Sequence, residues 1–128
     1  AAAVGDWRPK ERAKTKIKKT ATGRPLALEL VENPDILKNL CISKDRPKLV
    51  IGFAAETDNL LLNAKSKLKN KGCDWIIANK VNAESQNMGG EENEVIIVKK
   101  KQEIKLQRQS KKEIANLICK KIVEEISA

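Results

Sequence analysis

Lysines concentrated in segment 8–24 have the clearest capacity for chemistry in this sequence. Seven cations lie between Arg8 and Lys19, and a single acid, Glu11, opposes them. A run this dense is typical of either a solvated loop or a site for a polyanion, and composition gives the two interpretations about equal weight. If the loop closes over a polyphosphate, Lys16 at its centre would stabilise the charge that develops when a phosphate bond breaks.

Two aspartates could bind a cation or a nucleotide. Asp6 ends an apolar run just before a turn, where its carboxylate could instead accept backbone N–H groups of that turn. Asp35 falls in the first turn of a predicted helix, where the helix dipole alone would account for a carboxylate. Mg²⁺ typically uses one or two carboxylates together with substrate phosphates, and a helix start also offers free N–H groups to a phosphate.

A pair of lysines four residues apart, Lys67 and Lys71, shares one face of a predicted helix. Such pairs usually belong to a solvated face, and Lys65 and Lys69 make this helix basic all round. Two cations on one face are nevertheless suited to a triphosphate, which a single point charge does not neutralise. Phe53, the single phenylalanine, ends a predicted buried strand, so core packing is its default role.

The overall charge restricts the class of partner. A net charge of +9 and a pI near 9.6 favour a nucleic acid, an acidic membrane or a phosphorylated small molecule. Aromatic residues make up 2% of the chain, too few to serve as base-stacking platforms, so a nucleic-acid-binding domain without catalytic activity is the weaker alternative. The absence of histidine removes the commonest general base, which favours phosphate chemistry over proton shuttling.

Cysteine usage and hydropathy bear on the setting of the protein. Three cysteines without a C-x-x-C pair argue against a disulfide framework or a structural zinc site and indicate a reduced, cytoplasmic setting. No apolar stretch approaches the length of a membrane span. The chain is long enough for one domain with its own core, and its opening Ala-Ala-Ala-Val looks like the end of a buried strand that begins upstream.

Periodicity predicts strands that alternate with helices. The apolar runs 48–55 and 73–81 are typical of strands covered on both faces, and 26–32 alternates like a half-buried strand. A helix is expected within 56–72, and the alternating segments around Gln102 indicate an antiparallel hairpin. This order predicts an α/β fold with a sheet that is parallel at its centre, whose ligands bind at the carboxyl ends of the strands.

Short-range signals define the ends of the helices. Asn33 suits an N-cap, with Pro34 in the first helical position. Gly72 is placed to cap the carboxyl end of the second helix, and Ser110 with Glu113 forms a capping box before the last one. The apolar stripes expected on the two longer helices are Leu61, Ala64 and Leu68, and Ile114, Leu117, Ile118, Ile122 and Ile126.

Six motifs together resemble one family. In order along the chain they are AAAVGDWRP, KIKK, NPDIL, VIGFAAET, the spacing Lys67-Leu68-x-x-Lys71, and DWIIAN with a following Gly-Gly loop. The same motifs occur in this order in phosphopantothenate–cysteine ligase, also called phosphopantothenoylcysteine synthetase, which in bacteria is usually fused behind a flavin-dependent decarboxylase. Each motif alone is weak, but six at compatible spacing over the whole chain are specific.

The resemblance implies a fold and a reaction. The fold would be Rossmann-like, with a mostly parallel sheet, flanking helices and a C-terminal antiparallel hairpin. Bacterial members use CTP with Mg²⁺ to convert 4′-phosphopantothenate to an acyl-cytidylate, and the amine of L-cysteine then displaces CMP, a step of coenzyme A biosynthesis. A homodimer is implied, without a membrane or nucleic-acid partner, and FMN would belong only to the fused decarboxylase.

The resemblance also assigns roles to residues. Lys16 is implied as the catalytic lysine of a flexible flap over the triphosphate, spanning about 8–24, and Asp6 and Asp35 are implied to hold the metal. The nucleotide-binding set is Ala1, Ala2, Asp6, Lys16, Pro34, Asp35, Ile36, Leu37, Phe53, Lys67 and Lys71.

Some features depart from the family pattern. Gly5 stands where alanine is common, and Lys80 stands where aspartate is usual, which leaves the loop after Asn79 unassigned. The front of the family domain, with its glycine-rich first loop, the asparagine that holds the acyl-cytidylate and much of the dimer contact, has no counterpart here. Residues 1–128 are therefore expected to be the C-terminal part of a single synthetase domain, inactive by itself. The choice between CTP and ATP and the number of subunits stay open.

Overall fold

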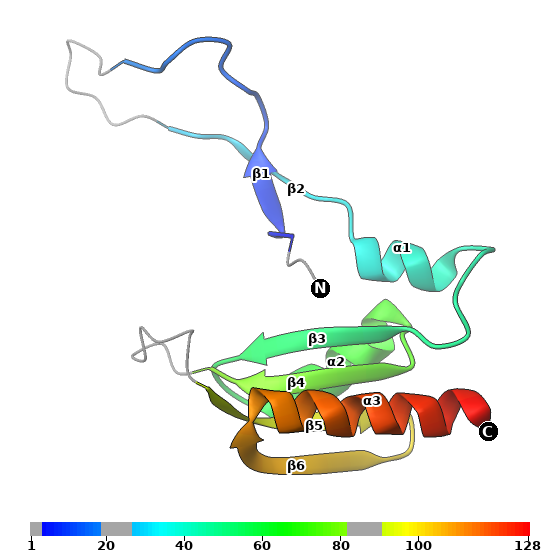
Figure 1. The fold of residues 1–128 in the computed structure, drawn as a ribbon. Helices are drawn as coiled ribbons and strands as arrows, with labels where there is room; N and C mark the ends of the chain where they lie inside the picture. The colour runs from blue at the N-terminus through cyan, green and yellow to red at the C-terminus, as the bar shows by residue number, and fades with distance from the viewer. Residues whose placement is uncertain (1–3, 19–26, 82–90) are drawn as a thin grey trace. The chain divides into compact units, whose positions relative to one another are not determined.

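The computed structural model describes residues 4–18, 27–81 and 91–128. The chain divides into two compact units, residues 1–36 and 37–128, and each is described here by itself (Figure 1). The larger unit holds a four-stranded sheet with helices on both faces, and the smaller unit holds a two-stranded ribbon.

The sheet of the larger unit is mixed. Its order is β3 (Ile51–Glu56), β4 (Trp75–Lys80), β5 (Glu92–Lys99) and β6 (Glu103–Ser110). Strands β3 and β4 are parallel because a helical crossover joins them, whereas the other two pairs are antiparallel. The predicted α/β class is confirmed, but parallel pairing within the described residues is limited to β3 and β4. The predicted C-terminal hairpin is present, with the Lys99 N–H bonded to the Gln102 carbonyl at 2.8 Å.

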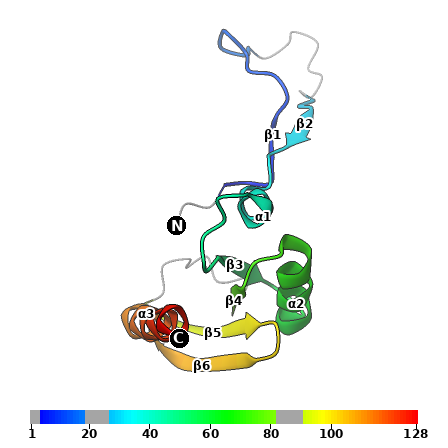
Figure 2. The ribbon, with the colours of Figure 1, turned by 90° about the vertical axis from the view of Figure 1, so that its right-hand side faces the viewer.

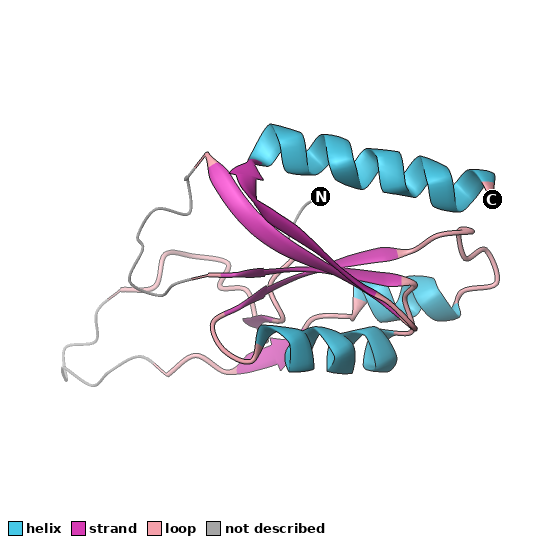
Figure 3. Ribbon diagram, turned by 90° about the horizontal axis from the view of Figure 1, so that it is seen from below, coloured by secondary structure: helices cyan, strands magenta, loops and turns pink. Residues whose placement is uncertain are grey.

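Alternate residues of the central strand β4 supply the cores of the two faces, as a strand requires. On one face, α2 (Leu60–Lys71) packs against the sheet, and on the other α3 (Lys111–Ser127) does so. Figures 2 and 3 show these two helices on opposite sides of the sheet. The first face buries Ala64, Leu68, Ile76, Ala78 and Val98, and the second buries Trp75, Ile77, Ile97, Leu106 and Ile114.

Helix α1 (Ile36–Ile42) also contributes to the first face, because Leu37 and Cys41 pack against that core. Its close approach depends on Gly52 of β3. A Cβ atom at residue 52 would lie 2.6 Å from Leu37 Cδ2 and 2.8 Å from Ile76 Cδ1, which is well inside van der Waals contact. Glycine at this position therefore lets the start of α1 seat on the strand.

The smaller unit is an antiparallel ribbon of β1 (Trp7–Pro9) and β2 (Leu30–Glu32). Trp7 pairs with Glu32 and Pro9 with Leu30, and the Lys10 N–H continues the ladder to the Glu29 carbonyl at 2.9 Å. The prediction of 26–32 as a strand of the central sheet is wrong in the described part, since β2 pairs with β1 instead. The predicted strand end at residues 1–4 lies almost wholly outside the described residues.

The predicted boundaries of α2 and α3 are confirmed. Gly72 adopts φ 75° and its N–H bonds to the Leu68 carbonyl at 3.1 Å, which caps α2. The capping box of α3 forms in both directions, with Glu113 N–H donating to Ser110 Oγ at 3.2 Å and Ser110 N–H donating to Glu113 Oε2 at 3.1 Å. The Ser110 hydroxyl, which donates to Glu113 Oε2 at 2.7 Å, and the Ser110 N–H together lower the pKa of the Glu113 carboxyl. Of the predicted stripe on α3, Ile126 is an exception, at 45% exposed.

Two local predictions fail for identifiable reasons. Asn33 does not cap α1, which begins at Ile36, because the Asn33 side chain is bonded within the ribbon instead. Phe53 is not a core residue within the described part of the chain, since it is 64% exposed.

The described cysteines are all free thiols, as predicted: Cys41 is half-buried, Cys73 is buried and Cys119 is exposed. Burial raises the pKa of the Cys73 thiol, which keeps it protonated. Among the helices that the structure describes, none combines the length and the apolar character needed to span a bilayer.

Candidate nucleotide site

The carboxyl ends of the two parallel strands define the candidate site of the larger unit. Glu56 ends β3 directly beside Lys80, which ends β4. Helix α2 starts just after β3, so its first turn lies at the same edge of the sheet, where α/β proteins bind their ligands. The sequence predicts ligand binding at this edge.

A half-buried carboxylate fixes one of the predicted lysines here. Glu56 Oε1 lies 2.7 Å from Lys67 Nζ, and Glu56 Oε2 accepts a hydrogen bond of 3.0 Å from Asn63 Nδ2. The Glu56 side chain is 14% exposed, whereas that of Lys67 is 43% exposed. The Lys67 contact, reinforced by Asn63, holds the pKa of the Glu56 carboxyl below its usual value although burial opposes this. The Glu56 carboxylate is thus favoured over its protonated form, and the Lys67 side chain beside it is partly open to water.

The turn between β3 and α2 depends on an unusual backbone conformation. Asn59 precedes the helix with φ 47° and ψ 40°, in the left-handed region that asparagine tolerates better than most residues. Its side chain makes no capping bond, and its carbonyl accepts the Asn63 N–H at 3.0 Å. Asn63 also donates through Nδ2 to the Asp58 carbonyl at 2.9 Å. Asn63 therefore joins the turn to Glu56.

The other predicted residues of the larger unit do not all gather around Lys67. Lys71 follows Lys67 one turn along α2 and is half-buried. Phe53 is on the face of β3 opposite to Glu56, because successive strand residues alternate between faces. Leu37 packs on Gly52. The structure therefore places Lys67 and Lys71 on one helix but does not bring the Phe53 ring to them.

In the smaller unit, hydrogen bonds join the two chain segments that carry the predicted aspartates. The Asn33 N–H donates to the Asp6 carbonyl at 2.7 Å, and Asn33 Nδ2 donates to the Gly5 carbonyl at 2.6 Å. Arg8 Nη1 donates to the Glu32 carbonyl at 2.6 Å and to Asn33 Oδ1 at 3.1 Å. The base of the ribbon is therefore held by side chains as well as by its short ladder.

The predicted metal ligands sit at this base. Asp6 is exposed and uses its backbone carbonyl, not its carboxylate, in the bonds above, while Asp35 is half-buried and Pro34 and Ile36 are exposed. No group of three or more acidic or cysteine side chains that could hold a metal occurs in the described ranges. Two carboxylates nevertheless fit the coordination preference of Mg²⁺, which takes few protein ligands and completes its coordination shell with phosphates and water.

The predicted flap spans about 8–24, and the structure describes its residues 8–18, which begin within β1. Lys16 is exposed on it, and within the described residues no acidic group pairs with it. Lys10 Nζ pairs with Glu29 Oε1 at 2.7 Å and ties the two sides of the segment near the ribbon. Ala1 and Ala2, both predicted to bind the nucleotide, lie outside the described residues.

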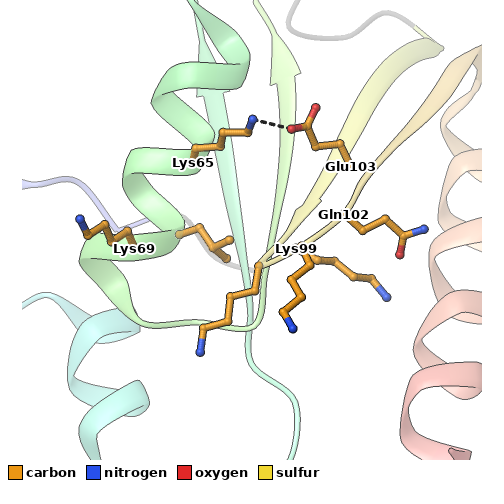
Figure 4. Close-up of a pocket in the computed structure, with 8 residues that line it drawn as sticks. Lys65, Lys69, Lys99, Gln102 and Glu103 are labelled. Carbon is orange, nitrogen blue, oxygen red and sulfur yellow. Dashed lines mark ion pairs between the residues drawn. The ribbon is translucent and has the colours of Figure 1, made fainter.

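Two features of the larger unit are not among the residues predicted from the sequence. One is Glu56 as the partner of Lys67, which an acid at the end of an otherwise apolar strand could have signalled. The other is a surface depression of about 620 Å³, lined by Lys65, Leu68, Lys69, Lys99, Lys100, Lys101, Gln102 and Glu103 (Figure 4). It lies at the opposite end of β4, since Lys99 pairs with Trp75.

The lysines of this depression are partly neutralised. Lys65 Nζ pairs with Glu103 Oε1 at 2.5 Å, as Figure 4 shows. Lys99 Nζ lies 2.6 Å from Glu125 Oε2 and 4.1 Å from the centroid of the Trp75 ring, a cation–π contact. These pairs account for part of the charge without a ligand, so the depression is not the predicted site.

Comparison with known proteins identifies the family of this chain. Residues 1–126 match the model of the DNA/pantothenate metabolism flavoprotein C-terminal domain, and the chain belongs to this family. The coenzyme A biosynthesis bifunctional protein CoaBC of Borreliella burgdorferi is 42% identical over 121 residues, which are 94% of this chain and 30% of that protein. The protein of the same name from Vibrio parahaemolyticus is 34% identical over 123 residues, 96% of this chain and 31% of that protein.

Solved structures give the same result. The C-terminal domain of a coenzyme A biosynthesis bifunctional protein CoaBC superposes with a TM-score of 0.70 at 35% identity, covering 98% of this chain and 52% of that one. The DNA/pantothenate metabolism flavoprotein from Streptococcus pneumoniae gives 0.65 at 26% identity, covering 83% and 45%. The chain thus spans about a third of the curated relatives it matches, and the predicted family is confirmed.

Proposed function

We propose that this chain supplies the nucleotide-binding part of a ligase that joins 4′-phosphopantothenate to L-cysteine in coenzyme A biosynthesis, with CTP as the activating nucleotide. The observation that carries the proposal is the position of Lys67. Its ammonium is held at the carboxyl end of β3, where an α/β sheet binds ligands, in a chain that belongs to a pantothenate-metabolism family. The relatives' bifunctional names support the pathway.

The proposed reaction has two steps. The carboxylate of 4′-phosphopantothenate attacks the α-phosphorus of CTP, pyrophosphate leaves, and an acyl-cytidylate forms. The amine of cysteine then attacks the acyl carbon, the bond to the cytidylate oxygen breaks, and CMP leaves with the electron pair while the amine loses a proton. Both leaving groups are phosphate anions, so the protein must mainly offset negative charge.

The residues of this chain would divide that task. Lys67 and Lys71 would bind the β- and γ-phosphates as point charges. Lys16, brought in on its segment, would stabilise the departing pyrophosphate in a partly dried site. Asp6 and Asp35 would hold Mg²⁺, which supplies charge neutralisation between phosphate oxygens. Phe53, exposed on β3, would pack against the apolar part of a ligand.

The resemblance also supports proposals about the whole protein. The full-length protein would be a cytoplasmic homodimer and would carry a flavin-dependent decarboxylase domain that binds FMN. Neither the second subunit nor the flavin would contribute to the roles of Lys16, Lys67 and Lys71 given above.

The test is product release by the full-length protein with Mg²⁺. We expect continued turnover, with CMP and pyrophosphate in equal amounts, only when 4′-phosphopantothenate and cysteine are both present, and less product when ATP replaces CTP. Omitting cysteine should leave a single turnover of pyrophosphate release with the cytidylate bound. The proposal is wrong if the protein consumes neither nucleotide under these conditions, or if nucleotide disappears at the same rate without the pantothenate substrate.

A further inference from the structure

Two lysine–glutamate pairs on the same helix differ in their surroundings. Lys67 of α2 pairs with Glu56, whose side chain is 14% exposed. Lys65, two residues earlier on α2, pairs with Glu103, whose side chain is 33% exposed. Exposed pairs contribute little because water solvates both partners and the long lysine chain loses entropy in pairing. The Glu56 pair is the one in which the carboxylate itself is fixed.

Glu56 is fixed from three directions. It stands at the last position of β3, which is paired in register with β4. Asn63 Nδ2 holds Oε2 at 3.0 Å and, at the same time, holds the Asp58 carbonyl of the turn. Oε1 is buried, and among the described residues its partner is the Lys67 ammonium. Because the Glu56 carboxylate is held in one orientation, the Lys67 ammonium that pairs with it is held in one position.

A lysine without such a partner explores many rotamers, and ordering it costs side-chain entropy. A cation that is already ordered pays less of this cost when a phosphate arrives. It also cannot move to whichever phosphate oxygen attracts it most in the ground state. The first consequence affects the affinity for the nucleotide, and the second affects the rate of the chemical step.

We propose that Glu56 is a positioning residue, which acts on the nucleotide through Lys67 by fixing the ammonium where charge develops on the leaving pyrophosphate. The inference deepens the proposed function and rests on it. Replacing Glu56 by glutamine removes a negative charge near the phosphates, so nucleotide binding is kept or strengthened. The unanchored lysine still binds the triphosphate but stabilises the transition state less, so the rate falls by about 10- to 100-fold.

The experiment uses four variants of the full-length protein: Glu56→Gln, Lys67→Gln, the double variant and Glu103→Gln. Glu103→Gln is the matched control, because Glu103 of β6 pairs with Lys65 of the same helix. For Glu56→Gln we expect kcat to fall by about 10- to 100-fold with KM for CTP unchanged or lower. The double variant should be no slower than Lys67→Gln alone, because Glu56 acts through Lys67. The control should match the wild type.

Three outcomes would overturn the inference. One is a Glu56→Gln variant with wild-type kcat. Another is a rise in KM for CTP, since the inference expects KM to be unchanged or lower. The third is a double variant whose rate loss is the product of the two single losses, which would show that Glu56 acts independently of Lys67.

A readout without turnover separates this inference from the proposed function. In protein labelled with ¹³C-lysine, side-chain relaxation should show Lys67 more ordered than Lys65, and Glu56→Gln should abolish the difference. If the wild type consumes no nucleotide, the proposed ligase is wrong, and with it the step that Lys67 serves. Equal disorder of Lys67 and Lys65 in the wild type would instead reject the positioning role while leaving the ligase intact.

Discussion

Asn33 donates a hydrogen bond of 2.6 Å from its side-chain amide to the carbonyl oxygen of Gly5. This bond joins the residue before Asp6 to the residue before Pro34, so it brings together two segments that the resemblance assigns to the nucleotide. Arg8 Nη1 supports it by donating to Asn33 Oδ1 at 3.1 Å. The proposed binding of metal and nucleotide by Asp6 and Asp35 therefore depends on the hydrogen bonds at the base of the ribbon.

Replacing Asn33 by alanine should uncouple those segments. We expect CTP affinity in the presence of Mg²⁺ to fall several-fold, since Asp6 and Asp35 lose their common support. The free energy of unfolding of residues 37–128 should change by less than about 0.5 kcal/mol, as for most surface substitutions. Calorimetric titration and hydrogen exchange measure the two effects. Loss of protection throughout β3 to β6 would contradict this division.

Lys16→Gln tests the proposed flap. The side chain is exposed, so the melting temperature should not change. Formation of the acyl-cytidylate should slow by ~10²–10³-fold, because a preorganised donor to developing charge is typically worth that much. Single-turnover kinetics of the full-length protein measure it, with Lys18→Gln, also exposed on the segment, as the control. Equal rates for Lys16→Gln and the wild type would identify Lys16 as a solvated surface lysine.

The lowered pKa of Glu56 predicts how stability depends on pH. The folded protein holds this carboxylate ionised to lower pH than the unfolded chain, mainly through Lys67. The pair's contribution is therefore complete above the ordinary pKa of 4.5 and is lost as the pH falls through the lowered folded value. Urea unfolding should show Glu56→Gln less stable than the wild type by about 1 kcal/mol at neutral pH.

That difference should shrink as the pH falls below 4.5. Glu103→Gln serves as the control, because its more exposed pair should give a small difference at every pH. A Glu56→Gln deficit that stays constant down to strongly acidic pH would show that the substitution acts through packing, not through the ionised pair.

Gly52→Ala tests the seating of α1. The added methyl would meet Leu37 Cδ2 at 2.6 Å and the buried Ile76 Cδ1 at 2.8 Å, so one of them must move. Overpacking of this kind typically costs about 1–3 kcal/mol. Ala55→Val, which adds volume at an exposed position of the same strand, is the control and should change stability little. Equal melting temperatures for Gly52→Ala and the wild type would show that α1 is not held by this contact.

Elements with local signals could be predicted from the sequence. Gly72 ends α2 because only a left-handed residue closes that helix, and Ser110 with Glu113 starts α3 through bonds that span three residues. The ribbon could not be predicted in the same way. Its pairing of Trp7 with Glu32 joins distant segments, and three-residue strands carry almost no periodicity.

The candidate site divides along the same line. The motifs assigned Lys67 to the candidate site, and in the structure its ammonium lies 2.7 Å from Oε1 of Glu56, the last residue of β3. The direction in which each side chain points could not be predicted, because it depends on which strand residue faces which helix. Phe53 lies on the face opposite to Glu56, and the bond from Asn63 that orders Glu56 exists only once α2 has packed.

The central claim is that Lys67 binds the phosphates of CTP, and a calorimetric titration of the full-length protein tests it most directly. With Mg²⁺ present, the wild type should bind CTP at one site per chain, Lys67→Gln should bind it at least tenfold more weakly (about 1.4 kcal/mol), and Lys69→Gln, on the same helix with an exposed side chain, should match the wild type. Cytidine, which lacks phosphates, should bind all three proteins with the same affinity. Equal CTP affinity of Lys67→Gln and Lys69→Gln would contradict the account.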